Sequence, residues 1–257
     1  MNAAAATPAP TLALERINKT FGGLVAIDEF SLDIYAGEVV ALVGDNGAGK
    51  STLIKIIAGV HRPTRGRMLI DGAEAIFNDP SDARQMGIQV VYQDLALADS
   101  QPVYMNMFLG RELTTGSLRR LDRRRMIAET ETVLHELDVR IPSARAIIRE
   151  LSGGQRQGVA IARATHWAAK LILMDEPTAA LGIAETQAVE EVIFGLRRQG
   201  LTVLVISHNL DQIFRITSGV WVMRRGRIIG YRETGTTRPD EIVSMITGAH
   251  ATAPSTP

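Results

Sequence analysis

Eight consecutive residues early in the chain have the types and spacing of a phosphate-binding loop. Residues 44–51 read Gly-Asp-Asn-Gly-Ala-Gly-Lys-Ser and match G-x-x-x-x-G-K-[ST]. Glycines let backbone N–H groups turn inward around an anion, the lysine adds positive charge, and the serine hydroxyl can bind Mg²⁺. We therefore predict that a nucleotide's phosphates are held by Gly44, Asp45, Asn46, Gly47, Ala48, Gly49, Lys50, Ser51 and the next residue, Thr52.

The flanking sequence favours this interpretation over a chance glycine turn. An apolar run at residues 39–43 predicts a buried strand before the loop. A helical pattern beginning at Lys50 would direct its positive dipole end at the same anion. The dinucleotide-binding pattern G-x-G-x-x-G is excluded, because Thr52 stands where its last glycine would be.

A second anion site is predicted at residues 151–155, Leu-Ser-Gly-Gly-Gln. Ser152 is placed to cap the helix that follows, and Gly153 and Gly154 would expose backbone N–H groups at its positive end. Gln155 completes the segment. A serine-glycine cap alone begins many ordinary helices, so only the whole pentapeptide is informative.

Polar side chains follow three apolar runs that predict buried parallel strands. Asp175 and Glu176 end residues 171–176, Gln93 ends residues 87–93, and His208 follows residues 201–207. Ligands of open α/β sheets bind at the carboxyl ends of strands. Asp175 would hold Mg²⁺ through water, and Glu176 would polarise an attacking water. By residue type alone, Gln93 is typical of an ordinary surface and His208 of a structural or solvated histidine.

Other segments supply the framework. Alternating patterns at 12–17, 24–27 and 30–34 predict strands of an antiparallel sheet with one covered face. Phe21 is predicted in a turn between the first two; its type favours a core position, whereas its place before the phosphate loop favours adenine stacking. Ser81 should cap a short helix, and residues 219–231 should form a hairpin around Arg225-Gly226.

Residues 94–165 lack strand patterns and predict a helical subdomain. It is inserted into a core of residues 12–93 and 166–248. The basic run 119–125 is best interpreted as a solvated helix face. Residues 1–11 and 249–257, which are small, polar and proline-bearing, are predicted to be disordered tails.

Composition narrows the function class. The 257 residues are 46% hydrophobic and 22% charged, with 28 basic and 28 acidic residues. This neutrality argues against a general nucleic-acid binder. There is no cysteine, so disulfides and cysteine metal sites are excluded. Because the start is not a signal peptide and no apolar run is long enough to span a bilayer, we expect a soluble cytoplasmic protein.

Taken in order, these motifs resemble those of the ABC ATPases, the nucleotide-binding subunits of ATP-driven transporters, over residues 12–248. The resemblance implies an α/β fold: a P-loop NTPase core of RecA type, an N-terminal antiparallel β subdomain and an inserted helical subdomain. It implies that Phe21 stacks on adenine and that Gln93 contacts Mg²⁺ and water and senses a membrane partner. It makes Glu176 the general base and His208 the contact to the γ-phosphate. The residues around these motifs are similar to those of the ATP-binding subunits of bacterial importers of ribose, xylose or fructose.

The resemblance also implies the cofactors, partners and location. ATP with Mg²⁺ would lie between the loop at 44–51 of one copy and residues 152–155 of a second copy, so a homodimer is expected on transmembrane permease subunits. The site would be cytoplasmic, at the inner face of the cell membrane, with an extracytoplasmic solute-binding protein as an indirect partner and no nucleic acid. Two alternatives are an ABC protein acting on nucleic acid or the ribosome, and a regulatory module with weak hydrolysis.

Two positions depart from the family pattern. The segment called the D-loop commonly reads Ser-Ala-Leu-Asp, but residues 179–182 read Ala-Ala-Leu-Gly. The carboxylate that usually assists communication across the dimer is therefore missing. Ser218-Gly219 replaces a common Asp-Arg pair, and no loss of hydrolysis is expected from that change.

Overall fold

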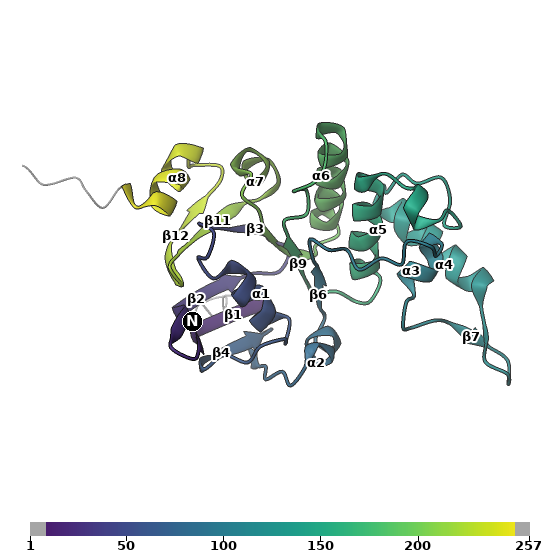
Figure 1. Cartoon of the computed structure of the whole chain (residues 1–257), viewed down its shortest axis with the longest axis horizontal. Coiled ribbons are helices and arrows are strands. Elements are labelled where there is room, and N and C mark those ends of the chain that lie inside the picture. The colour runs from purple at the N-terminus through teal and green to yellow at the C-terminus, as the bar shows by residue number, and fades with distance from the viewer. Residues whose placement is uncertain (1–8, 250–257) are drawn as a thin grey trace, which may run out of the picture.

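The computed structural model describes residues 9–249, in which two β-sheets are joined to a group of helices at one end (Figure 1). The larger sheet has the strand order β12-β11-β3-β10-β9-β6. Its pairs are parallel except for β11 with β12. The strands are β3 (Val39–Val43), β6 (Ile88–Val91), β9 (Leu171–Asp175), β10 (Thr202–Ile206), β11 (Gly219–Arg224) and β12 (Arg227–Glu233). The apolar runs that predicted buried strands form β3, β9 and β10, as expected.

The second sheet is antiparallel, with the order β2-β1-β4-β5. Its strands are β1 (Leu12–Phe21), β2 (Leu24–Ile34), β4 (Arg65–Ile70) and β5 (Ala73–Glu74). The prediction of three short strands before residue 35 is wrong, because two long strands cross this region with register shifts. Arg16 (φ 46°) and Glu29 (φ 47°) adopt left-handed backbone angles, which interrupt the alternation that sequence reading relies on. Phe21 is accordingly the last residue of β1 and not part of the turn.

Helix α1 (Lys50–Ile57) lies between the two sheets and joins their cores (Figure 1). Its buried face, which includes Leu53 and Ile57, belongs to one apolar cluster with Phe30 of β2 and Leu42 of β3. This burial fixes the angle at which the preceding loop enters the helix. Helix α2 (Pro80–Gln85) is capped by Asp79 and not by Ser81 as predicted. Pro80 at the first helical position favours this earlier start.

The helices between β6 and β9 gather at the end of the molecule away from β12 (Figure 1). They are α3 (Val103–Met107), α4 (Arg123–Glu136), the short 3₁₀ helix η1 (Ile148–Glu150) and α5 (Gly153–Thr165). A small hairpin of β7 (Thr114–Thr115) and β8 (Arg120–Leu121) was not predicted. The first part of the basic run 119–125 is therefore not helical, and the helix begins only at Arg123. An apolar cluster unites α3, α4 and α5 with α6 (Ile183–Arg198) and one face of the larger sheet.

The last part of the described chain returns to the phosphate loop. Helices α7 (Leu210–Ile216) and α8 (Pro239–Thr247) flank the predicted hairpin, which β11 and β12 form around Arg225-Gly226. The Gly226 N–H donates to the carbonyl of Ala48 (2.9 Å), and the Gly226 carbonyl accepts from the Asp28 N–H (2.9 Å). The hairpin tip therefore connects the loop at 44–51 to strand β2.

Two sequence predictions concern regions at the limits of the description. Most of the predicted tails, residues 1–8 and 250–257, lie outside the described residues. At Thr11, the last residue of the predicted N-terminal tail, the prediction of disorder is wrong, because Thr11 is buried and its carbonyl accepts a hydrogen bond from the Asp71 N–H. The subdomain boundaries at 93/94 and 165/166 stay predictions. None of the helices in residues 9–249 has the length and apolar character needed to cross a membrane.

Candidate functional site

The loop at 44–51 connects β3 to α1 along a path that requires glycine at two positions. Gly44 has φ +156°, and a Cβ there would overlap the carbonyl oxygen of Met223. Gly49 has φ +107°, and a Cβ there would lie 2.6 Å from the carbonyl oxygen of Ala26. Strands from both sheets thus press against the loop, so its backbone is held in place before any ligand binds.

The side chain of Lys50 folds back over this loop. Its Nζ donates to the carbonyl oxygens of Gly44 (2.6 Å) and Asp45 (2.9 Å). Burial lowers the pKa of Lys50, while the carboxylates of Glu176, Asp45 and Asp175 act in the opposite direction. The lysine braces the loop and brings positive charge to its mouth, where an anion would meet it.

Two acids end the adjacent strand β9. Burial, followed by the negative charge of Glu176, raises the pKa of Asp175. Glu176 has a left-handed backbone (φ 51°), and its N–H donates to the carbonyl of Ile206 at the end of β10 (2.8 Å). Its carboxylate Oε2 lies 2.8 Å from His208 Nδ1. The non-glycine left-handed residue is thus held by neighbouring strands and directs its carboxylate toward the histidine.

One cavity of about 780 Å³ brings most of the predicted residues together. It is lined by loop residues of 46–52 and by Phe21, Gln93, Asp175, Glu176 and His208. Gln93 lies beyond the end of β6. The parallel order of β3, β10, β9 and β6 explains the grouping, because their carboxyl ends meet at one edge of the sheet.

Phe21 forms the apolar end of this cavity. The residue is 42% exposed and lies beside Leu24 and Val25, which are also exposed. The ring packs edge-on against His61 with the centroids 5.3 Å apart, and Lys19 Nζ lies 5.0 Å from its centroid. An exposed ring at a cavity wall can stack on a planar ligand, which a core position would not allow.

The predicted cap at the start of α5 has the expected geometry but lies outside this cavity. The Ser152 Oγ accepts from the Gln155 N–H (3.3 Å), and Gln155 Oε1 accepts from the Ser152 N–H (3.0 Å), which forms a capping box. A smaller hollow of about 340 Å³ is lined by Gly153 together with Gln93 and Glu176. Ser152 and Gln155 line neither of these two hollows.

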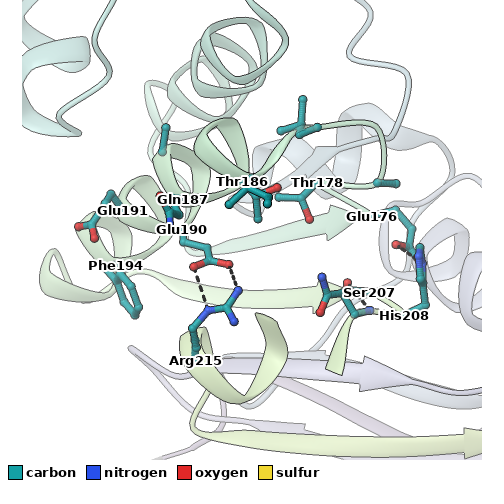
Figure 2. A pocket seen from close by; sticks show the side chains of 15 residues that line it. Glu176, Thr178, Thr186, Gln187, Glu190, Glu191, Phe194, Ser207, His208 and Arg215 are labelled. Atoms are coloured by element: carbon teal, nitrogen blue, oxygen red, sulfur yellow. Dashed lines mark hydrogen bonds and ion pairs between the residues drawn. The ribbon is translucent and has the colours of Figure 1, made fainter. Parts of the chain in front are cut away.

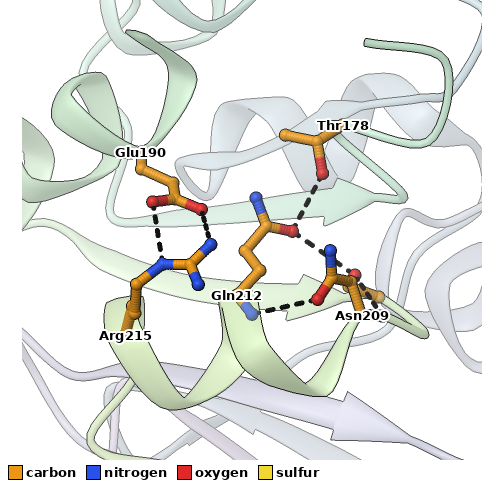
Figure 3. Close-up of polar contacts among 6 residues, drawn as sticks. Thr178, Glu190, Asn209, Gln212 and Arg215 are labelled. Carbon is orange, nitrogen blue, oxygen red and sulfur yellow. Dashed lines mark hydrogen bonds and ion pairs between the residues drawn. The ribbon is translucent and has the colours of Figure 1, made fainter. Parts of the chain in front are cut away.

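Sequence reading missed a buried polar network behind the histidine (Figure 3). Gln212 of α7 is fully buried, and its Oε1 accepts from Thr178 Oγ1 (2.9 Å) and from Ser207 Oγ at 3.5 Å. Ser207 Oγ in turn accepts from the Asn209 N–H (3.1 Å). The network connects the segment after Glu176 to both neighbours of His208. No short motif signals it, because its members come from two segments that are far apart in the sequence, Thr178 and residues 207–212.

The same network borders a groove of about 970 Å³ between α6 and α7 (Figure 2). Glu176 and His208 lie at one end of it, and a pair between Glu190 and Arg215 lies farther along, toward Glu191 and Phe194 at the opposite end. Arg215 donates to both carboxylate oxygens of Glu190 (2.7 and 3.2 Å), whose side chain is only 7% exposed. This pair joins α6 to α7 and so supports the element that carries the network.

Comparisons with known proteins agree with this geometry. Residues 27–179 match the family model described as ABC transporter. The chain belongs to the ABC transporter family. ATP-binding proteins of this family are ATPases, so the chain is an ABC-type ATPase, and its two-sheet architecture is the P-loop NTPase cassette expected from the sequence.

Curated relatives of this ABC ATPase include sugar-import proteins. It is 47% identical to a xylose/arabinose import ATP-binding protein of Sulfolobus acidocaldarius, over 92% of this chain and 93% of the relative. It is 40% identical to a fructose import ATP-binding protein of Rhizobium meliloti, over 93% and 95%. A ribose import ATP-binding protein of Streptomyces avermitilis is 42% identical, but the match covers 94% of this chain and 47% of that protein.

Solved structures support the same fold. The ADP conformation of an ATP-binding cassette of an ABC transporter superposes with a TM-score of 0.79 at 27% identity, covering 93% of this chain and 95% of that one. A dimeric bacterial ABC transporter cassette superposes with a TM-score of 0.72 at 25% identity, covering 87% and 98%. The roles of individual site residues remain predictions after these comparisons.

Proposed function

We propose that this chain is the ATP-hydrolysing subunit of an ABC importer for a simple sugar. The observation that carries the proposal is the 47% identity to a xylose/arabinose import ATP-binding protein along nearly the full length of both chains. The fructose and ribose import relatives belong to the same solute class. The cavity supports hydrolysis, since it combines a lysine for phosphates with a carboxylate next to a histidine.

ATP occupies the 780 Å³ cavity in this proposal. Phe21 stacks on adenine, and residues 44–52 surround the phosphates. The α1 N-terminus and Lys50 supply positive charge there, and Lys50 exchanges its carbonyl partners at Gly44 and Asp45 for phosphate oxygens. The held path of the loop means that little backbone ordering accompanies binding.

The residues present also fit a Mg²⁺ ion. In residues 9–249 no three His, Cys, Asp or Glu side chains gather into a metal site, so a cation here depends on oxygen ligands of other kinds. Ser51, Gln93 and Asp175 offer a hydroxyl, an amide and a carboxylate in the one cavity. The raised pKa of Asp175 reflects burial and the nearby Glu176, a setting that a divalent cation relieves. Bound Mg²⁺ would neutralise charge on the phosphates.

Glu176 then acts as the general base toward water, and His208 contacts the terminal phosphate. The left-handed backbone of Glu176 and its N–H bond to Ile206 keep the carboxylate at the end of β9. Gln93 touches the cation and water and transmits the state of the site to the membrane partner.

The cap at Ser152, Gly153, Gly154 and Gln155 requires a second copy, because Ser152 and Gln155 do not line the cavity. We assign it to the phosphates held by the opposite subunit in a head-to-tail homodimer. Closure around ATP and reopening after hydrolysis move two permease subunits at the cytoplasmic face of the membrane, and a solute-binding protein delivers the sugar from outside.

The test is Glu176→Gln, which keeps the shape of the side chain and removes the base. Steady-state ATP hydrolysis should be abolished, while ATP should still produce a dimer in light scattering. Glu191→Gln, the same change at an exposed position of α6, serves as the control and should hydrolyse normally. Turnover by Glu176→Gln at the wild-type rate would remove Glu176 from its role. Transport of xylose, ribose and fructose in vesicles with the cognate permease tests the sugar class.

A further inference from the structure

The backbone N–H groups of Gly154, Gln155 and Arg156 in the first turn of α5 all have partners within the chain. The Gln155 N–H bonds to Ser152 Oγ (3.3 Å), and the Arg156 N–H bonds to the Ser152 carbonyl (2.9 Å). The Gly154 N–H donates to Glu185 Oε1 (3.2 Å), and the same carboxylate lies beside Gly153. A helix begins with four N–H groups that lack intrahelical partners. Here an acidic side chain from α6 accepts from the Gly154 N–H, which the cap does not use itself, and lies close to Gly153.

Glu185 is brought to this position by the start of its own helix. It is the third residue of α6, and its Oε2 accepts from the Gly182 N–H (3.2 Å). One carboxylate therefore joins the beginnings of α5 and α6 through hydrogen bonds. Its partner Gly154 lies 31 residues before Glu185 in the sequence. Gly182 stands where the family commonly has aspartate, and Glu185 brings a carboxylate to this segment three residues later.

The glycines of the cap are needed for this close approach. A Cβ on Gly154 would lie 2.9 Å from the Cβ of Glu185, and a Cβ on Gly153 would lie 3.3 Å from its Oε1. The glycines thus make room for the first turn of α6 as well as exposing N–H groups.

The carboxylate is ionised at neutral pH. Hydrogen bonds from Gly154, Gly182 and Ser152 lower the pKa of Glu185. A full negative charge therefore lies against the N–H groups that the proposed function assigns to the phosphates of an opposing subunit. Two anions at the same donors exclude each other, so one has to leave when the other arrives.

We infer that Glu185 is an internal competitor for the cap, whose carboxylate occupies the phosphate position of residues 152–154 until ATP on a second copy displaces it. This inference rests on the proposed function, since it assumes the head-to-tail dimer. Its consequence is that the dimer closes only at higher ATP concentration than an unoccupied cap would require. In the subunit without a partner, the N–H groups at the start of α5 keep their hydrogen bonds. The Glu185 contact raises the ATP concentration needed for dimerisation and leaves the hydrolysis step unchanged.

The experiment measures closure directly in the hydrolysis-deficient background Glu176→Gln. Light scattering gives the ATP concentration at which half of the protein is dimeric. Adding Glu185→Gln should lower this midpoint about three- to tenfold, because a neutral oxygen accepts such hydrogen bonds about half as strongly as a carboxylate. Adding Glu185→Asp, which is one methylene shorter, should lower it less.

The matched control is Glu191→Gln in the same background, which removes one negative charge from α6 near the cap but no hydrogen-bond acceptor of its N–H groups, and should change the midpoint far less than Glu185→Gln. A midpoint that is equal to or higher than that of Glu176→Gln in folded Glu185 variants would overturn the inference. It would mean that Glu185 holds the cap in its working form and does not compete. No ATP-dependent dimer in the Glu176→Gln background itself would instead refute the proposed sandwich, and this inference with it.

Discussion

The buried network around Gln212 gives a sharp test of how α7 is held behind the histidine. Thr178→Val keeps the shape of the side chain and removes the hydroxyl that donates to Gln212 Oε1 at 2.9 Å. Gln212 is 0% exposed, so water does not replace the lost donor. The remaining donor, Ser207 Oγ at 3.5 Å, is at the limit of hydrogen-bond distance.

The expected magnitude follows from these contacts. Losing one hydrogen bond costs about 1 kcal/mol of the free energy of unfolding, and leaving a buried carbonyl poorly satisfied brings the total to about 1–2 kcal/mol. In a domain of this size, each kcal/mol lowers the melting temperature by roughly 2–4 °C, so we expect a loss of roughly 2–8 °C. Thermal unfolding followed by circular dichroism measures it.

Two further variants make this prediction refutable. Thr186→Val, in the first turns of α6 and bordering the same groove, is the control, because its hydroxyl takes part in none of the side-chain hydrogen bonds of residues 9–249. Combining Thr178→Val with Gln212→Met should restore part of the loss, since both polar partners are then absent. A melting temperature of Thr178→Val equal to that of Thr186→Val would refute the argument.

Two other predictions concern charge. Arg215→Met leaves the buried Glu190 carboxylate without its partner and should lower the free energy of unfolding by about 2 kcal/mol in denaturant titrations. This loss is smaller than for a fully buried pair, because half of the Arg215 side chain is exposed. Adding Glu190→Gln should restore most of the lost stability, and no recovery would contradict the pairing argument. Burial lowers the pKa of His166 in the folded protein. As the pH falls below 6.5, this histidine is protonated in the unfolded chain before it is protonated in the folded one, so the free energy of unfolding should decrease. His166→Gln should flatten that part of the pH profile of the melting temperature, and an unchanged slope would exclude His166 as its source.

Local chemistry made much of the nucleotide cavity predictable. The strand, loop and helix around Lys50 are contiguous, and the acids at Asp175 and Glu176 directly follow an apolar run, so the burial pattern and the parallel-sheet rule place them at the same edge. The Ser152 cap was predictable for the same reason, because its partner Gln155 is three residues away. The strong signals are therefore those whose parts lie close together in the chain.

The missed features depend on contacts between distant segments or on backbone irregularities. Glu185 meets Gly154 from 31 residues away, and Gln212 meets Thr178 from 34 residues away, and no spacing in the sequence records either contact. The left-handed Glu29 shifts the alternation in β2, so one strand was interpreted as two. At α2, Pro80 occupies the first helical position, so the cap is Asp79 and not Ser81, which the sequence pattern predicts.

The central place of β3 in the sheet has a consequence for synthesis. Its two neighbours are β10 and β11, and Ser218 Oγ bonds to the Val39 carbonyl across 179 residues of sequence. A chain emerging from the ribosome therefore exposes its apolar third strand and the adjoining glycine segment long before either flanking strand exists. Nascent chains that stop before the Arg225-Gly226 turn lack the Gly226 contact to Ala48. They therefore leave the ribosome with exposed, aggregation-prone apolar surface and without a formed phosphate-binding loop.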